Sequence, residues 1–309
     1  RLTEKFSKKL EILFQLKGDK DKSLPRIVNS NGLTPKDRKK WKQIINLALE
    51  KIHNLEIKKV VLSRKVDLIL SDSINLTVSL NSLREDYPDC FLFAYHKRNS
   101  TFFGATPELL AKISDKKIEL NAIAGSAKRG TSPEDDSKLE SELLNNKKDL
   151  DEHSYVLEHL KETLKNFSEN ISYDKIPSVK KFKNIQHLST RISASLKDNS
   201  GIMNILKEVH PTPAVCGYPK ETALNLIKKT ESQKRGLYSG IIGWFNFNNE
   251  GEFAVSIRSA ITKGNKLTAY AGGGIVEGSE PDAEFEETEM KLKPILSLFT
   301  ERSENEKKD

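Results

Sequence analysis

The sequence predicts an α+β protein in which two antiparallel β-meanders form a sandwich-like core with helices packed outside it. Apolar segments with strand-like alternation follow one another at about 91–123 and again at about 237–271, separated only by short polar turns. Short turns join antiparallel neighbours. The helical patterns are collected in other parts of the chain, whereas a parallel sheet needs strict alternation of strand and helix.

The N-terminal part combines two helical patterns with one strand. Apolar residues recur at helical spacing over residues 2–16. Thr34 before Pro35 is a good N-cap and first-turn pair for a second helix, and a strand follows at about 58–70. We therefore divide the chain into a helical and loop segment at 1–34 that we expect to be truncated, a single domain at 35–300, and a charged tail at 301–309.

Each meander consists of three strand-like segments. Pro107 interrupts the middle segment of the first meander, and an Asn-Asn-Glu-Gly turn at 248–251 separates the first two segments of the second. The strands expected in the two meanders are 91–96, 101–113, 118–123, 237–247, 253–262 and 267–271. We expect helices at 133–166, 201–209 and 219–230, and one or two strands at 179–196.

The charge of the chain is positive but diffuse. Among its 309 residues, 51 are Lys or Arg and 44 are Asp or Glu, which gives a formal net charge of +7. A scattered positive field attracts a small dianion and attracts nucleic acid only weakly. Aromatic residues make up 7% of the chain and do not alternate with lysines as stacking platforms do, so we expect no nucleic-acid partner.

Cysteine usage and hydropathy predict a cytoplasmic protein. Cys90 and Cys216 have neither CxxC spacing nor further cysteines to pair with, which favours free thiols in a reducing compartment and implies no zinc site. No apolar run approaches the roughly 20 residues of a membrane helix, so we expect no membrane partner. Residue 1 is Arg rather than Met, which is consistent with a trimmed form of a longer protein.

A triple glycine followed by an acidic helix is the most informative pattern. The glycines at 272–274 allow a ligand to approach the backbone, and Glu284 and Glu287, three residues apart, share a helical face on which they can bind a divalent cation. The alternative is a solvated acidic helix in which Glu287 pairs with Lys291. Taken alone, the pattern favours this alternative.

Two further segments carry candidate acid and base groups. Lys58 and Lys59 begin a strand, so their side chains point to opposite faces and at most one points inward. A buried lysine has a lowered pKa and can serve as a general base, although solvated edge lysines are the commoner case. Glu108 follows the strand-breaking Pro107, which would aim its carboxyl into a cleft or leave it as a turn residue.

Three more segments carry candidate ligand-binding groups. Glu152 lies in the charged helical region, where Asp149 shares its face, although most such acids are only solvated. His210 begins a loop stiffened by three prolines in nine residues, where ligand positioning and structural capping are equally good interpretations. Arg258 lies in an otherwise apolar strand and needs a carboxylate partner from the protein or from a substrate.

Taken together, these segments resemble the chorismate-utilising enzymes, and most closely the isochorismate synthases of menaquinone and siderophore pathways. The resemblance covers roughly residues 40–300. It is carried by ordered motifs at 59–64, 106–110, 124–126, 151–153, 210–215, 238–240, 257–258 and 272–291.

The resemblance implies a role for each candidate residue. Lys59 would activate a water toward C2 of chorismate, Glu108 would protonate the departing C4 hydroxyl, and His210 would join them as a third catalytic residue. Mg²⁺ would be held by Glu152 and Glu287, with Glu284 close by or linked through water. The substrate-binding residues that it implies are Ala124, Gly125, Thr212, Tyr238, Arg258, Gly272, Gly274 and Lys291.

The choice within the family rests on fewer residues. Aminodeoxychorismate synthases carry a nucleophilic lysine at the position of Ala124, and anthranilate synthases usually lack the lysine at Lys59. Salicylate synthases keep that lysine and differ mainly around the loop at 210–215. The resemblance therefore favours isochorismate synthesis, with salicylate or anthranilate synthesis as the alternative.

A different class of function is also open. A pI near 9.1 and many lysines are compatible with a noncatalytic anion-binding or nucleic-acid-binding module on the same scaffold. No apolar stripe can be assigned to a subunit interface, so we expect a monomer or a weak homodimer.

Overall fold

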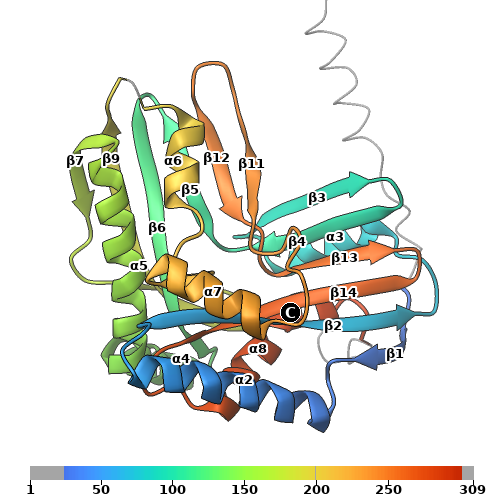
Figure 1. Cartoon of the computed structure of the whole chain (residues 1–309). Coiled ribbons are helices and arrows are strands. Elements are labelled where there is room, and N and C mark those ends of the chain that lie inside the picture. Colours follow the sequence, from blue (N-terminus) through green and yellow to red (C-terminus); the bar gives the residue numbers. More distant parts are fainter. Residues whose placement is uncertain (1–23, 199, 301–309) are drawn as a thin grey trace, which may run out of the picture.

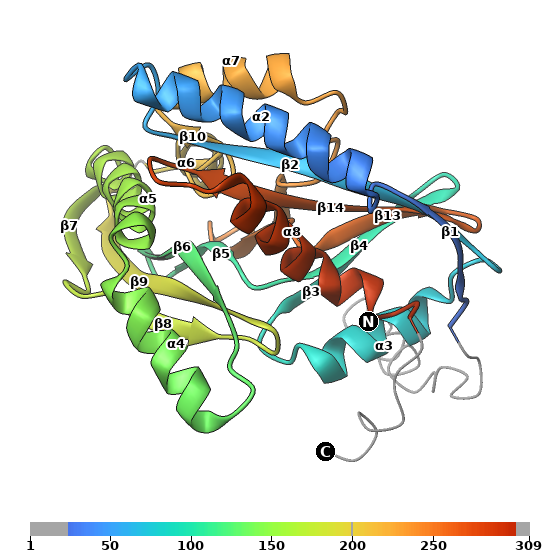
Figure 2. The ribbon, with the colours of Figure 1, turned by 90° about the horizontal axis from the view of Figure 1, so that it is seen from below.

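A computed structural model of the chain describes residues 24–198 and 200–300. Its strands form two antiparallel sheets of seven strands each. The strands of one sheet run in a different direction from those of the other, and the helices lie around both sheets (Figures 1 and 2). This is the α+β class that the sequence predicts. The first sheet contains β1 (Ile27–Asn31), β2 (Lys59–Leu70), β3 (Phe91–Lys97), β4 (Ser100–Thr106), β10 (Gly217–Tyr218), β13 (Ser259–Lys263) and β14 (Lys266–Ile275). The second contains β5 (Leu109–Ser114), β6 (Lys117–Lys128), β7 (Ser168–Tyr173), β8 (Ser178–Lys181), β9 (Ile185–Leu196), β11 (Ile241–Phe245) and β12 (Gly251–Val255).

Each predicted meander crosses from one sheet to the other. In the first, β3 and β4 belong to the first sheet, whereas β5 and β6 belong to the second. In the second, β11 and β12 belong to the second sheet, and β13 and β14 belong to the first. The expected single strand at 253–262 is therefore wrong, because the backbone leaves the second sheet after Val255 and enters the first at Ser259. Both crossings carry a candidate site residue, Glu108 in one and Arg258 in the other.

The helices close three apolar clusters. α5 (Lys147–Lys165) and α6 (Ile202–Val209) cover the second sheet, where Leu160, Ile192 and Ile205 are buried together. α3 (Leu76–Asp86) and α8 (Pro281–Leu296) cover the first sheet. α2 (Pro35–His53) and α7 (Lys220–Thr230) pack against the start of β2, and α4 (Pro133–Asn145) precedes α5.

Local sequence explains several helix boundaries. Thr34 caps α2, as predicted, and forms a reciprocal capping box with Asp37. The charged region expected as one helix at 133–166 is two, because Asn146 ends α4 and its side chain accepts a hydrogen bond from the backbone N–H of Asp149 at the start of α5. The sequence pattern did not predict α3.

The first 34 residues are described only in part. Residues 27–31 form strand β1, which pairs with the far end of β2, so this part of the expected helical and loop segment belongs to the first sheet. The helical pattern at 2–16 and the tail at 301–309 lie outside the described residues. Within the described ranges, none of the helices has the length and apolar character needed to cross a bilayer.

Candidate active site

A cavity lies where the two sheet crossings meet helices α5 and α8. It collects residues from β2, β6, β9, β14, both crossings and the loop after α6, which are far apart in the sequence. Nine of the fourteen predicted site residues line it: Glu108, Ala124, Gly125, Glu152, Tyr238, Arg258, Gly272, Gly274 and Lys291. The other lining residues are Val61, Pro107, Ile123, Ser126, His187, Ala214, Val215, Ser239 and Ile257.

The backbone of the second crossing holds Glu108 in the cavity wall. The Glu108 carbonyl accepts a hydrogen bond from the Val255 N–H at 3.0 Å, and the Thr106 hydroxyl donates to the Val255 carbonyl at 2.6 Å. Burial raises the pKa of Glu108 to about 7, although the positive charges of Arg258, Lys59 and Lys291 oppose the shift. A carboxyl with this pKa is poised to donate a proton near neutral pH.

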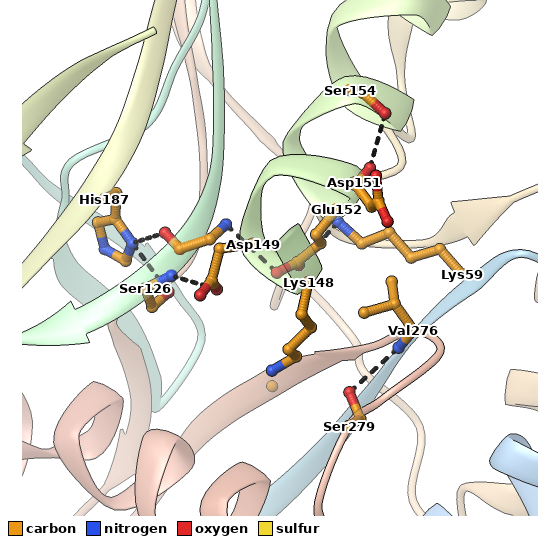
Figure 3. Close-up of polar contacts among 12 residues, drawn as sticks. Lys59, Ser126, Lys148, Asp149, Asp151, Glu152, Ser154, His187, Val276 and Ser279 are labelled. Carbon is orange, nitrogen blue, oxygen red and sulfur yellow. Dashed lines mark hydrogen bonds and ion pairs between the residues drawn. The ribbon is translucent and has the colours of Figure 1, made fainter. Parts of the chain in front are cut away.

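Lys59 lies directly behind the lining residue Glu152. The Lys59 side chain is fully buried, and its Nζ is 2.9 Å from Glu152 Oε1. The other oxygen of Glu152 accepts a hydrogen bond from the Gly125 N–H at 3.3 Å (Figure 3). Of the two lysines that begin β2, Lys59 is therefore the one that points inward, whereas Lys58 is exposed. The alternation of the strand predicts this difference.

The three glycines of β14 face opposite sides of the first sheet. A Cβ atom on Gly274 would overlap Glu152 Oε1 and would lie 3.2 Å from Lys59 Cε, and a Cβ atom on Gly272 would lie 3.0 Å from the Tyr238 hydroxyl. Gly273 faces α8, where its Cβ atom would lie 3.4 Å from Glu284 Oε2. Gly272 and Gly274 are thus required for the close approach of side chains to the cavity wall.

Each of the three predicted metal ligands is paired with a lysine. Lys59 binds Glu152, Lys148 Nζ lies 2.6 Å from Glu284 Oε1, and Lys291 pairs with Glu287. Lys291 also donates to the Gly272 carbonyl at 3.1 Å. Over the described parts of the chain, no three acidic, histidine or cysteine side chains are grouped closely enough to hold a metal ion. The structure therefore brings the three carboxylates to one region without joining them in a single ligand cluster.

The electrostatics of the two acidic residues on α8 differ. Burial raises the pKa of Glu284 to about 7, the negative charge of Glu287 adds to the shift, and Lys148 opposes it. Burial also acts to raise the pKa of Glu287, but Lys291 and Lys148 outweigh this effect and lower it. The second oxygen of Glu284 is buried and makes no hydrogen bond of good geometry among the described residues, although the nearby Ser279 hydroxyl also acts to lower the pKa of this carboxyl. A buried carboxylate oxygen without a partner is costly and fits a cation ligand.

Arg258 and Tyr238 contribute the other polar groups to the wall. Arg258 is in the left-handed region at φ 51°, and its Nη2 lies 3.3 Å from His187 Nε2. Since the guanidinium can only donate, Nε2 accepts, and the His187 proton is on Nδ1, 3.2 Å from the Gly125 carbonyl. Tyr238 stacks on Tyr270 with ring centroids 5.3 Å apart, and burial raises the pKa of its hydroxyl to about 12.

Sequence reasoning missed several residues of the site. His187 lies in a stretch without clear periodicity, yet it joins Arg258 to the Gly125 turn and contacts the Ser126 hydroxyl at 3.0 Å (Figure 3). Lys148 precedes Asp149, and burial raises the pKa of Asp149 to about 6. The face shared by Asp149 and Glu152 and the motif at 151–153 indicated that this turn of α5 enters the site, but neither indicated Lys148.

Five predicted site residues lie outside the cavity lining: Lys59, Glu284, Glu287, His210 and Thr212. The first three lie against its wall as described above, whereas His210 and Thr212 belong to the loop after α6. His210 is partly buried before a cis proline, and burial lowers its pKa to about 4. Thr212 is buried, and its carbonyl accepts hydrogen bonds from Val215 and Cys216. Both residues instead shape the loop that brings Ala214 and Val215 to the wall.

Comparison with known proteins identifies the family. The sequence matches the family described as chorismate binding enzyme over residues 1–300. The chain belongs to this family. Isochorismate synthase MenF of Bacillus subtilis is 37% identical over 263 residues, which are 85% of this chain and 56% of that protein. Anthranilate synthase component 1 of Saccharolobus solfataricus is 32% identical over 266 residues, which are 85% of this chain and 62% of that protein.

The family fold is also seen in solved structures. The structure of MenF, the menaquinone-specific isochorismate synthase of Escherichia coli, matches with a TM-score of 0.82 and 28% identity, covering 94% of this chain and 68% of that chain. The chain therefore has the fold of these chorismate binding enzymes. It spans little more than half the length of the Bacillus subtilis relative.

Proposed function

We propose that this chain converts chorismate to isochorismate. The observation that carries the proposal is one cavity that combines Glu108, whose pKa is about 7, with Glu152 and the buried Lys59 behind it. Arg258, Lys291 and Tyr238 line the same cavity and offer donors for a substrate with two carboxylates. Relatives named isochorismate synthase support the choice of substrate.

The proposed reaction exchanges one hydroxyl for another on the substrate ring. A water oxygen forms a bond to C2, and its proton passes to the Lys59 amine. The ring double bonds shift, the C4–O bond breaks, and the hydroxyl leaves as water with the proton of Glu108. Lys59 acts as general base and Glu108 as general acid, and the raised pKa of the buried Glu108 carboxyl suits its role as proton donor.

We further propose that Glu152, Glu287 and Glu284 hold Mg²⁺. The unpartnered oxygen of Glu284 and the mutual repulsion of Glu284 and Glu287 support a bound cation. Oxygen ligands of this kind suit Mg²⁺, and the ion would supply positive charge that holds a substrate carboxylate beside the acidic side chains. Lys59 occupies an oxygen of Glu152 and Lys291 occupies one of Glu287, so these two pairs would rearrange on binding the ion. Lys148 binds Oε1 of Glu284 and leaves Oε2 free.

The first test is product formation. The protein is incubated with chorismate and Mg²⁺, with and without an ammonium salt, and the products are separated. We expect isochorismate in both cases. Salicylate, or anthranilate formed only with ammonium, would instead support the alternative syntheses within the family, and anthranilate synthase component 1 is a named relative. No conversion together with salt-sensitive binding of single-stranded DNA would support the noncatalytic module.

The adjacent lysines of β2 provide a matched test of the base. Lys59→Gln removes the buried amine, and we expect a loss of turnover of at least roughly 100-fold, because positioned general bases contribute about that much. Lys58→Gln changes the exposed neighbour and should stay close to the wild-type rate. Thermal unfolding of both variants separates loss of chemistry from loss of folding. Equal rates for the two variants would refute the role of Lys59.

A further inference from the structure

The strand that carries Lys59 has an open stretch on one edge. Tyr218 and Gly217 of β10 pair with residues 59–60 of β2, and β1 pairs with residues 67–70. Between these points, residues 61–66 have a strand neighbour in the described chain only on the side of β14. Unpaired N–H and C=O groups at such an edge need other partners. Val61, in this stretch, is part of the cavity wall.

Side chains from the loop after α7 take the place of the missing strand. Glu231 Oε1 accepts a hydrogen bond from the Ser63 N–H at 2.7 Å, and Gln233 Nε2 donates to the Ser63 carbonyl at 2.9 Å. Arg235 Nη2 donates to the Val61 carbonyl at 2.7 Å. Alternate residues of the loop therefore satisfy the N–H and carbonyl of Ser63 and the carbonyl of Val61, as the backbone of a neighbouring strand would, while the Val61 N–H donates to the Cys216 carbonyl at 2.9 Å.

Arg235 links three separate segments of the cavity wall. Besides Val61, its Nη1 donates to the Val215 carbonyl at 2.7 Å and lies 3.5 Å from the Ser239 hydroxyl. Its backbone carbonyl accepts a hydrogen bond from the Tyr238 N–H at 3.0 Å. Val61, Val215, Tyr238 and Ser239 all line the cavity, whereas Arg235 itself does not.

Glu231 neutralises the guanidinium and fixes its orientation. Arg235 Nε lies 2.9 Å from Glu231 Oε2, and the exposed fractions of the two side chains are 17% and 4%. A nearly buried carboxylate that is fixed on β2 by the Ser63 N–H leaves the arginine little freedom to turn. Only the planar guanidinium can bind this carboxylate and still donate to two carbonyls in different directions, because a lysine presents its donors from a single nitrogen.

We propose that the Arg235–Glu231 pair is a positioning device that sets the shape of the substrate cavity by fixing the 214–215 loop and the 238–239 turn against β2. Arg235 touches no reacting atom, so it acts through Val61, Val215 and Tyr238. The consequence for catalysis rests on the proposed function, whereas the consequence for the two loops does not.

The test replaces two arginines, Arg235 and Arg129, by lysine in separate variants. Each of these guanidinium groups binds a carboxylate and also donates to a backbone carbonyl. Arg235→Lys keeps the charge but loses the fork, and Arg129→Lys is the matched control. Arg129 binds Asp136 through two nitrogens and donates to the Phe182 carbonyl at 2.7 Å, but neither Arg129 nor these two partners line the cavity. For R235K we expect kcat/KM for chorismate to fall roughly 100-fold, as for a small misplacement of reacting groups. The control should stay within about threefold of the wild type, since its fork holds no wall segment.

Hydrogen exchange measured by mass spectrometry gives a second readout that needs no substrate. R235K should speed exchange in peptides covering 212–216 and 236–240 together, and R129K should change neither. If R235K is too unstable to purify, Glu231→Gln replaces it, with a loss of kcat/KM of roughly 10-fold and the same two peptides affected. Unchanged exchange in these peptides, or equal kcat/KM for R235K and R129K, would overturn the proposal. A wild-type protein that leaves chorismate unchanged would refute the proposed function alone, and the exchange data would still decide whether the pair holds the two loops.

Discussion

At the residue scale, the environment of Glu108 predicts an unusual dependence of stability on pH. Burial raises its pKa from the ordinary value of 4.5 to about 7. Between these values the folded state binds more protons than the unfolded state, so the free energy of unfolding falls as pH rises through this window. The full difference corresponds to about 3 kcal/mol. Glu108→Gln removes the titrating group and with it this pH-dependent loss of stability. The stability of the variant relative to wild type should therefore be greater at pH 8 than at pH 5.

Thermal unfolding at the two pH values measures this effect. The control is Glu119→Gln, which makes the same change on β6. The Glu119 side chain is 41% exposed and pairs with Arg191, so it is not desolvated as Glu108 is. This control should follow the wild-type pH dependence. The same E108Q protein should be at least roughly 100-fold slower with chorismate if Glu108 is the general acid. A variant that follows the wild-type pH dependence of stability would contradict the assigned pKa.

At the scale of single elements, the sequence predicted where the strands lie better than which strands they pair with. Alternation and turns located most strand segments in both meanders, since they depend on neighbouring residues. Which sheet a strand joins depends on contacts between distant segments. No local pattern marked the crossing between Val255 and Ser259, which contains Arg258. Glu108 could be predicted because Pro107 breaks the strand beside it, whereas His187 and Arg235 lie where neither periodicity nor a turn motif distinguishes them.

The alternation of strand β14 gives a test at the same scale. Gly274→Ala would place a methyl group against Glu152 and Lys59, whereas Gly273→Ala would place one in near-ordinary contact with Glu284 on the other face. Overpacking of this kind costs about 1–3 kcal/mol. We expect G274A to lower the melting temperature and to reduce turnover strongly, because it displaces the proposed base and a proposed metal ligand. G273A should be much closer to wild type in both measurements.

The relative effects of G274A and G273A on melting temperature and turnover decide whether Gly274 makes room for Glu152 and Lys59. Equal effects of G273A and G274A would mean that the glycines serve only the backbone of β14. The prediction needs the strand register, since Gly274 opposes Val61 and Gly273 opposes Leu62 in the pairing with β2. A one-residue shift would exchange the two faces.

At the scale of the whole molecule, the site joins the two sheets. Glu152 comes from α5, which covers the second sheet, and Glu287 comes from α8, which covers the first. Glu108 and Arg258 come from the two crossings between the sheets. The order of these residues in the sequence reflects none of this proximity, which is why the resemblance to a family could place them in one site and periodicity alone could not.

Bridging of α5 and α8 by Mg²⁺ would stabilise the fold as a whole. A ligand that binds only the folded state at 100 times its Kd contributes about 2.7 kcal/mol, which should raise the melting temperature by several degrees. Glu287→Gln should abolish this shift. Glu286→Gln is the matched control. The Glu286 side chain lies next to Glu287 on α8, but it is 67% exposed and pairs with Arg38 of α2. Chelation with EDTA should reverse the shift in the wild type and in E286Q. If Mg²⁺ left the wild-type melting temperature unchanged, or shifted E287Q equally, the three carboxylates would be structural partners of their lysines and not a metal site.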